Sequence, residues 1–348
     1  MSLQQFQIIK PKQITLQQFI QNMPKIELHS HLSGAIRRET LKKLLEKKNI
    51  SYDNSIFEKN DMLESYKIFD YIYQGLQTLD DIKQVTEEIL HDNQEQNVVY
   101  LELRSTPKQT QQFTQQDYLN TIFQVMYDFE QNEQNFLKPR FILSIDRTKS
   151  IEEAYKRVDL YQQFKRDIKF SKYLVGLDFC GDPQVNDFKN FKEVFQKAKD
   201  QNIKITLHGS EQKNNENETQ YIIDFKPDRI GHFLVYNNKQ FEQVIKNRIP
   251  IEMCPTSNLY AQQLKSYDQH HFINFFQNKH PISLNTDDFC CFNSNITQEF
   301  MQIALTFKLQ KQDIYKIMHD TIQMIFDNQN QNELQQITDK YFQNFEFI

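Results

Sequence analysis

The chain is organised around one stretch, Lys25-Ile26-Glu27-Leu28-His29-Ser30-His31-Leu32-Ser33-Gly34. Apolar and polar residues alternate through it, which predicts a β-strand that leads into a glycine-containing loop. Residues two positions apart in a strand point to the same side, so His29 and His31 become neighbours at its carboxyl end. Two such imidazoles form half of a metal site, although an isolated pair is more often structural. The rest of the chain decides between these interpretations.

The composition excludes several classes of protein. At 348 residues the chain suffices for one large domain or two ordinary ones. Its net charge of -5 offers no basic patch for a nucleic-acid backbone, and no run of about 18 apolar residues exists to span a membrane. The N-terminus lacks a signal-peptide pattern, and the four cysteines lack the spacing of a disulfide framework. We therefore expect a cytoplasmic protein.

Strand-like and helix-like segments alternate along most of the chain. The eight strand-like segments lie at residues 26–29, 98–103, 141–146, 173–179, 203–208, 229–232, 250–254 and 281–285. Alternation that reaches eight strands predicts an α/β protein of the (β/α)8 TIM-barrel class rather than an open doubly wound sheet.

Two helical regions extend this pattern. Residues 57–92 form a helical insertion after the first strand, and its length makes it a candidate lid. Residues 296–348 add C-terminal helices. Because no repeat and no Pro/Gly/Ser-rich linker divides the chain, we expect a single domain spanning residues 1–348.

Polar residues collect where the predicted strands end, which is where active sites of such barrels lie. Four of the nine histidines fall there, together with the carboxylate pair Asp287-Asp288. His29, His31, His208 and Asp287 supply a nitrogen-rich ligand set that suits Zn²⁺ and leaves a position for water. A zinc ion lowers the pKa of such a water to about 7, which makes hydroxide available at neutral pH.

Three more strand-end residues are candidates for catalysis. Glu211 can exchange a proton with a substrate if burial raises its pKa, His232 can orient the attacking hydroxide, and Asp288 can bond to a ring nitrogen. Other polar residues have structural interpretations. We expect Asp178 to tie a loop, and we favour a structural role for the pair His270-His271 over a second metal pair.

The strand-end motifs resemble those of the adenosine deaminase family of metal-dependent hydrolases. The matching segments, in family order, are residues 24–32, 181–182, 208–211, 228–232, 254–258 and 285–288. They are distributed along nearly the whole chain. The resemblance implies one Zn²⁺ per chain, held by His29, His31, His208 and Asp287. It also implies that Glu211 is the proton donor, that His232 orients the hydroxide, and that Gly181 and Asp288 contact the purine.

Within the family, the chain is most similar to the adenosine deaminase-like branch, whose members remove the amine from N6-methyl-AMP. Residues 100–108, 146–147 and 266–272 carry this resemblance. The substrate contacts that follow from it are His31, Ser33, Tyr73, Ser105, Thr106, Pro107, Lys108, Asp146, Gly181 and Asp288. Ser33 and Tyr73 depart from the asparagine and histidine of the branch. A serine at position 33 does not repel a phosphate, as the acidic residue of nucleoside deaminases would, and Lys108 can attract one.

We therefore expect a zinc-dependent enzyme that deaminates a small-molecule purine nucleotide, converting N6-methyl-AMP to IMP and methylamine. One alternative is deamination of free adenosine to inosine and ammonia. An alternative of another class is a non-catalytic purine-binding protein, which predicts loss of a metal ligand or of Glu211; the sequence shows neither. We expect a monomer that binds no membrane, and we do not expect a nucleic-acid substrate.

Overall fold

The computed structural model describes residues 11–58, 62–213 and 215–347, and the side chains of all of these except residues 62–66. Eight strands form one parallel sheet in the order of the sequence, from β2 to β9. These strands are β2 (Lys25–His31), β3 (Val98–Ser105), β4 (Lys138–Asp146), β5 (Leu174–Cys180), β6 (Lys204–Gly209), β7 (Arg229–His232), β8 (Ile251–Met253) and β9 (Ile282–Leu284). Each coincides with a predicted strand, so the prediction of eight strands is confirmed.

The sheet closes on itself through the segment that follows β9. Ser30 of β2 forms a parallel bridge with Asp287. The His31 amide donates to the Asp287 carbonyl at 3.1 Å, and the Asp287 amide donates to the His29 carbonyl at 2.9 Å. The Asn285 side chain adds a third link, because its Oδ1 accepts from the Leu28 amide at 3.0 Å. The first and last strands are thereby joined, and the predicted (β/α)8 barrel is confirmed.

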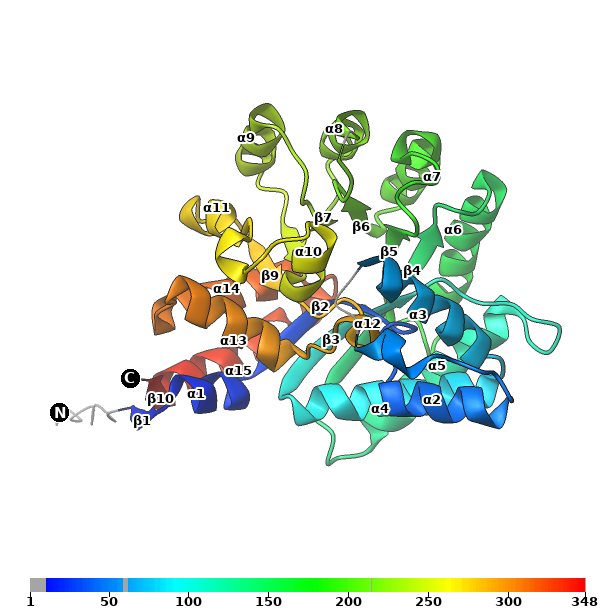
Figure 1. The fold of residues 1–348 in the computed structure, drawn as a ribbon, viewed down its shortest axis with the longest axis horizontal. Helices are drawn as coiled ribbons and strands as arrows, with labels where there is room; N and C mark the ends of the chain where they lie inside the picture. The colour runs from blue at the N-terminus through cyan, green and yellow to red at the C-terminus, as the bar shows by residue number, and fades with distance from the viewer. Residues whose placement is uncertain (1–10, 59–61, 214, 348) are drawn as a thin grey trace.

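Helices surround the strands, as Figure 1 shows. They are α1 (Leu16–Asn22), α2 (Arg38–Lys47), α3 (Met62–Gly75), α4 (Leu79–Glu95), α5 (Gln115–Gln131), α6 (Ile151–Lys165), α7 (Phe188–Asp200), α8 (Glu216–Phe225), α9 (Asn238–Asn247), α10 (Pro255–Ala261), α11 (Phe272–Gln277), α12 (Phe289–Phe292), α13 (Ile296–Phe307), α14 (Lys311–Met324) and α15 (Gln331–Asn344). Capping boxes start several of them; at α5, for example, the Thr114 hydroxyl accepts from the Asp117 amide. Apolar side chains fill the space between strands and helices, such as Phe179 of β5 against Phe191 of α7.

The predicted insertion at residues 57–92 contains α3 and most of α4, and its residues 59–61 lie outside the described part of the chain. Helix α3 packs against α2 and α12. Lys108 holds the carboxyl end of α3, because its Nζ donates to the carbonyls of Tyr73 at 2.8 Å and Leu76 at 2.7 Å. The role of this insertion as a lid, and the organisation of residues 1–348 as one domain, stay predictions.

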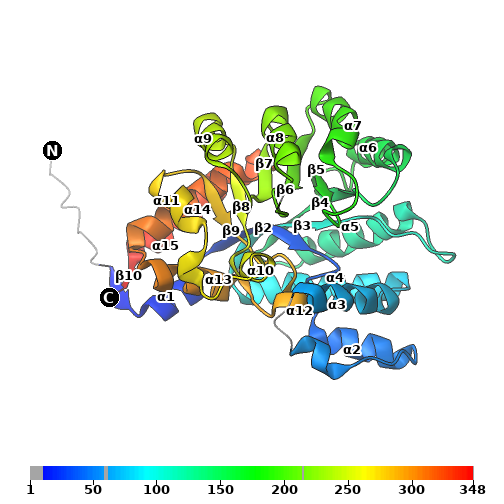
Figure 2. The same cartoon turned by 45° about the horizontal axis from the view of Figure 1, so that its top comes forward.

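A second, two-stranded sheet joins the ends of the described chain and was not predicted. Strand β1 (Lys12–Ile14) pairs in parallel with β10 (Phe345–Phe347). Figure 2 shows β10 beside α1, and the Tyr341 hydroxyl of α15 donates to the Phe19 carbonyl of α1 at 2.8 Å. Three residues are too few for an alternating pattern to stand out in a sequence, so this sheet left no usable signal.

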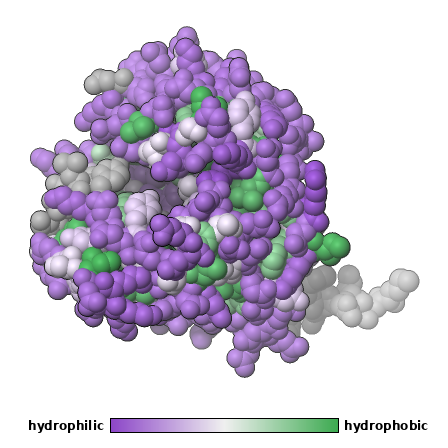
Figure 3. Space-filling model, turned by 90° about the vertical axis from the view of Figure 1, so that its right-hand side faces the viewer, coloured by the Kyte–Doolittle hydropathy of each residue, from purple (hydrophilic) through white to green (hydrophobic). Residues whose placement is uncertain are grey.

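The surface view in Figure 3 is mostly hydrophilic, with only small separate hydrophobic areas. Among the described residues, no helix combines the length and the apolar character that crossing a membrane requires.

Candidate active site

Strand β2 brings His29 and His31 to the barrel opening, where they meet His208 from the end of β6. The Nε2 atoms of His31 and His208 lie 3.1 Å apart. Hydrogen bonds fix the rings of His29 and His208 from behind, since Nδ1 of His29 lies 2.7 Å from Glu252 Oε2 and Nδ1 of His208 lies 2.9 Å from Asp178 Oδ1. With the Nδ1 proton engaged, each Nε2 directs its lone pair into the same space.

Asp287 completes this group of four predicted metal ligands. Its Oδ1 lies 3.5 Å from His29 Nε2 and 3.4 Å from His31 Nε2. Two ligands bound at about 2.1 Å to one tetrahedral ion lie about 3.4 Å apart, so these spacings suit a single cation. His29 Nε2 is buried without a hydrogen-bond partner, which is an energetic cost that a cation would remove. The four residues therefore fit a metal ion.

His232 and Cys254 lie beside the same space. Potential ligand atoms of His29, His208 and His232 lie within 4.8 Å of one another, and so do those of His29, Cys254 and Asp287. Cys254 is 1% exposed and occupies this position as a small buried side chain. His232 Nε2 lies 3.9 Å from both Glu211 Oε1 and Asp287 Oδ2. The structure thus joins His232 and the predicted proton donor to the four ligands.

The backbone at two of these residues adopts the left-handed region, which disfavours residues other than glycine. The φ angle is 64° at His232 and 62° at Asp287. Such a conformation costs about 1–3 kcal/mol and persists only where the surroundings impose it, most often at functional sites. At Asp287 the imposing contacts are the two main-chain bonds to β2 that close the barrel.

Burial and charge set the protonation of the three carboxyl groups. Burial raises the pKa of Glu211, and its Oε2 has no hydrogen-bond partner. Burial also acts on Asp287, but its contact with His29 and the charges of the neighbouring histidines hold its pKa well below the usual range. Burial and the negative charge of Asp287 together raise the pKa of Asp288 well above the usual range. The group therefore combines one carboxylate with two carboxyl groups that tend to retain a proton.

Close approach of the main chain explains two glycines here. A Cβ on Gly34 would lie 1.6 Å from Asp288 Oδ1, an atom that has no hydrogen-bond partner. A Cβ on Gly181 would lie 2.4 Å from Asp146 Oδ1, and the φ angle of Gly181 is +105°. Each glycine lets the main chain pass directly beside a predicted substrate contact.

The other predicted substrate contacts lie at or just after the ends of β2 and β3 in the sequence, or at the carboxyl end of α3. The Ser105 hydroxyl bonds with the Tyr118 hydroxyl at 2.8 Å, and the Thr106 hydroxyl lies 3.8 Å from Cys180 Sγ. Pro107 is buried between Thr106 and Lys108, whose ammonium bonds to the end of α3. Tyr73 is 56% exposed. The pKa of its hydroxyl is raised by partial desolvation and by the nearby Cys180 and Asp146. Ser33 is half-buried, next to Gly34.

With this geometry in view, comparison with known proteins identifies the family. The sequence model described as adenosine deaminase matches residues 24–341. The chain belongs to the adenosine deaminase family. It is a hydrolytic deaminase that acts on a C–N bond.

Individual members of the adenosine deaminase family match over most of their length. An Arabidopsis thaliana protein named N6-mAMP deaminase is 32% identical over 339 residues, which cover 89% of this chain and 94% of that protein. The Homo sapiens N6-methyl-AMP deaminase is 33% identical over 322 residues, covering 88% and 90%. The crystal structure of Arabidopsis ADAL complexed with IMP matches with a TM-score of 0.85 at 32% identity, covering 93% of this chain and 98% of that one.

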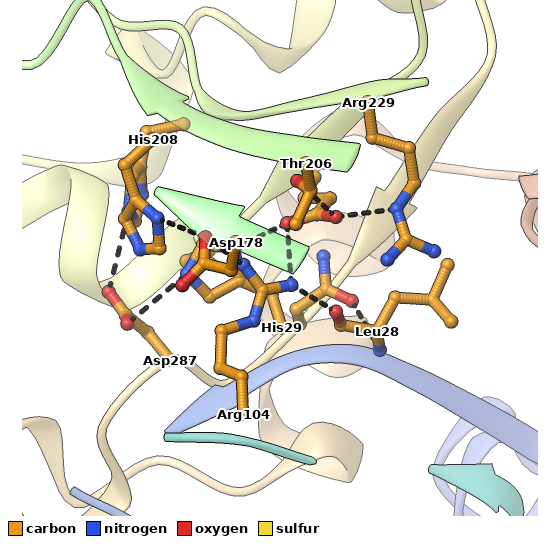
Figure 4. Close-up of polar contacts among 12 residues, drawn as sticks. Leu28, His29, Arg104, Asp178, Thr206, His208, Arg229 and Asp287 are labelled. Atoms are coloured by element: carbon orange, nitrogen blue, oxygen red, sulfur yellow. Dashed lines mark hydrogen bonds and ion pairs between the residues drawn. The ribbon is translucent and has the colours of Figure 1, made fainter. Parts of the chain in front are cut away.

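Charged residues inside the barrel, which the sequence patterns did not predict, contact the residues of this site. Figure 4 shows Arg104 near Asp178 and His29. Its Nη1 lies 3.3 Å from Asp178 Oδ1 and its Nη2 lies 2.8 Å from Glu252 Oε2, so Arg104 bridges the two carboxylates that hold the histidines. The interpretation of Asp178 as a loop tie is therefore wrong. The available signal was charge at strand positions flanked by apolar residues, as in Ile251-Glu252-Met253, because a buried charge requires a partner.

Proposed function

We propose that this protein converts N6-methyl-AMP to IMP and methylamine. The observation that carries the proposal is the set of three buried polar atoms without partners at one strand-end group: His29 Nε2, Glu211 Oε2 and Asp288 Oδ1. A metal-binding nitrogen beside two carboxyl groups with raised pKa values suits hydrolysis at a ring carbon flanked by ring nitrogens. The similarity to N6-methyl-AMP deaminases and to the ADAL–IMP structure supports a purine nucleotide as substrate.

We further propose that the metal is Zn²⁺, held by His29, His31, His208 and Asp287. Three imidazoles and one carboxylate form a ligand set that favours zinc over magnesium or calcium. Zinc at this position would supply a Lewis acid and a water of lowered pKa.

The protein's own groups then divide the remaining work. Glu211, with its raised pKa, donates a proton to the ring nitrogen adjacent to the attacked carbon. Asp288 hydrogen-bonds to another ring nitrogen from a position directly beside Gly34, and Gly181 contacts the purine. His232 orients the attacking oxygen from a position 3.9 Å from Glu211 Oε1.

The nucleotide preference rests on charge at the predicted substrate contacts. Ser33 places no negative charge beside the metal ligands, whereas an acidic residue there would repel a 5′-phosphate. Lys108 places a positive charge at the end of α3, beside Tyr73. Free adenosine, the alternative substrate, would leave this charge without a partner in the ligand.

The test measures product formation from N6-methyl-AMP and from adenosine in parallel, with and without a chelator. We expect chelator-sensitive IMP formation and little inosine. Inosine without IMP would overturn the nucleotide proposal in favour of adenosine deamination. Turnover of neither by metal-replete protein would favour a purine-binding protein. Ser33→Asp sharpens the test, because the added carboxylate should raise the KM for the nucleotide while changing that for adenosine little.

We also propose that the protein acts as a cytoplasmic monomer. The proposed site consists of seven residues of one chain, so it does not require a second copy. They are His29, His31, His208, Glu211, His232, Asp287 and Asp288. Its four cysteines, Cys180, Cys254, Cys290 and Cys291, are free thiols, which suits a reducing compartment. Light scattering after size-exclusion chromatography tests the monomer, and a mass twice that of the 42.0 kDa chain would contradict it.

A further inference from the structure

One buried amide, that of Asn258 in α10, connects the active site to the pair His270-His271. Its Nδ2 lies 3.0 Å from Nδ1 of His232, and its Oδ1 lies 3.3 Å from Nε2 of His270. Asn258 and His270 are both 0% exposed. The sequence offered no reason to join these residues: His232 ends β7, whereas Asn258 and His270 both lie between β8 and β9.

The orientation of this amide follows from a main-chain donor. The Cys254 amide donates to Asn258 Oδ1 at 3.2 Å, and a backbone N–H can only donate. The oxygen of the side chain therefore faces Cys254, and the NH2 group must face His232. Consequently Asn258 donates to Nδ1 of His232, and that nitrogen presents a lone pair rather than a proton.

The far end of the chain of hydrogen bonds gives the same direction independently. The Phe272 amide donates to Nδ1 of His270 at 3.0 Å, so this nitrogen also presents a lone pair. The remaining proton of His270 lies on Nε2, from which it is donated to Asn258 Oδ1. Two backbone amides, at Cys254 and Phe272, thus polarise the whole series toward His232.

We propose that Asn258 is a positioning residue that fixes His232 as the tautomer with its proton on Nε2. His232 then meets the attacking oxygen as a hydrogen-bond donor and not as a base. The surroundings of Nε2 agree, because two carboxyl oxygens that can accept a hydrogen bond, Glu211 Oε1 and Asp287 Oδ2, lie 3.9 Å from it. His271 supports the arrangement, since its Nε2 lies 3.1 Å from the His232 carbonyl.

A base at this position would need the opposite arrangement. A neutral base needs its lone pair on Nε2 and therefore carries its proton on Nδ1. That proton would point at the N–H group of Asn258. The tautomer itself does not depend on the substrate; its catalytic consequence rests on the proposed function. The experiment therefore reads the tautomer and the turnover separately.

The decisive variant is Asn258→Asp, which has nearly the same shape. Its carboxylate still accepts from Cys254 and His270 but no longer donates to His232, so it should draw the proton to Nδ1. Two-bond 15N–1H spectra of zinc-loaded, histidine-labelled protein distinguish the tautomers, and the signals that disappear in His232→Gln identify His232. We expect a protonated Nε2 in the natural protein and a protonated Nδ1 in Asn258→Asp. We also expect kcat for N6-methyl-AMP to fall at least about 100-fold with KM changed little, as a wrong tautomer does elsewhere.

Asn274→Asp is the matched control, because it makes the same change at an exposed position of α11. It should alter neither the His232 signals nor kcat. A protonated Nδ1 in the natural protein would overturn the proposal whatever the activity. So would a large loss of kcat in Asn258→Asp without a change of tautomer, which would indicate a merely structural role. Inactivity of the natural protein with a protonated Nε2 would instead overturn the proposed function alone.

Discussion

The interior of the barrel and its carboxyl-terminal opening treat buried charge in opposite ways. In the interior, Arg104 pairs with Asp178 and Glu252 at 3.3 and 2.8 Å, and Arg229 pairs with Glu102 and Glu252 at 2.6 Å each. At the opening, buried atoms of His29, Glu211 and Asp288 have no hydrogen-bond partner; the Nε atom of Arg104 in the interior has none either, but its two terminal nitrogens are paired. A buried polar group without a partner costs about 1–3 kcal/mol. At the opening, a ligand can therefore supply the missing hydrogen-bond partners.

Replacement of an unpaired group at the opening should have the largest effect, and on activity rather than stability. Glu211→Gln removes the proposed proton donor but keeps the shape, and we expect kcat to fall about 100- to 10,000-fold. Steady-state kinetics with N6-methyl-AMP measure this, with thermal unfolding to show that stability is retained. Glu242→Gln, at an exposed position of α9, is the control and should leave kcat unchanged. Activity within tenfold of the natural protein would show that the unpaired oxygen has no catalytic use.

Replacement of a paired group in the interior should instead lower the stability of the protein. Arg104→Met leaves Asp178 and Glu252 without their shared guanidinium, and loss of one partner of a buried ion pair costs about 3–5 kcal/mol. Urea unfolding measures the free energy of unfolding. Arg166→Met, at an exposed position, should change it by less than about 0.5 kcal/mol. A loss below 1 kcal/mol for Arg104→Met would remove the contrast between the two regions.

The two regions also differ in how far the sequence reveals them. The opening was predictable, because His29, His208 and Asp287 lie at strand ends that the barrel topology gathers into one place. The interior was not, because alternation identifies a strand but does not tell which charge on it pairs with which. Glu252 and His29 are far apart in the sequence, and only the closed barrel sets their side chains 2.7 Å apart. The short pair β1–β10 escaped for another reason, its length of three residues per strand.

Glu299 of α13 offers an intermediate case, a buried carboxyl group with one paired oxygen and one unpaired. Its Oε2 accepts from the Thr256 amide at 3.0 Å, its Oε1 has no partner, and burial raises its pKa from 4.5 to about 7. Between these values the folded state keeps a proton that the unfolded state has lost, so stability falls as pH rises. The loss is complete above pH 7 and amounts to at most about 3 kcal/mol.

Glu299→Gln should therefore be more stable than the natural protein at pH 8 and similar to it at pH 4.5. Urea unfolding across this pH range checks the prediction, and the exposed change Glu242→Gln should leave the pH profile as it is. An unchanged difference in stability at all pH values would contradict the titration of Glu299.

The smallest expected effect lies where the interior meets the opening. Asp178→Asn keeps an acceptor for Nδ1 of His208 but removes the charge behind it, and such changes weaken metal binding about 10- to 100-fold. Competition with a chromophoric chelator measures the affinity. Asp182→Asn, an exposed change in the loop after the same strand, is the control. An affinity within twofold of the natural value would mean that the ring is held by shape alone.

The closing seam of the barrel has a consequence for the order of events in the cell. Asp287 is both a proposed metal ligand and the residue whose main chain bridges to Ser30, which lies 257 positions earlier in the sequence. During synthesis, β2 leaves the ribosome long before the segment after β9 has been made, so one edge of β2 stays unpaired until then. The site can assemble only after the final strand has been made and docked. Metal uptake would then mark a finished molecule, and a chain truncated before residue 287 would gain no stability from the metal.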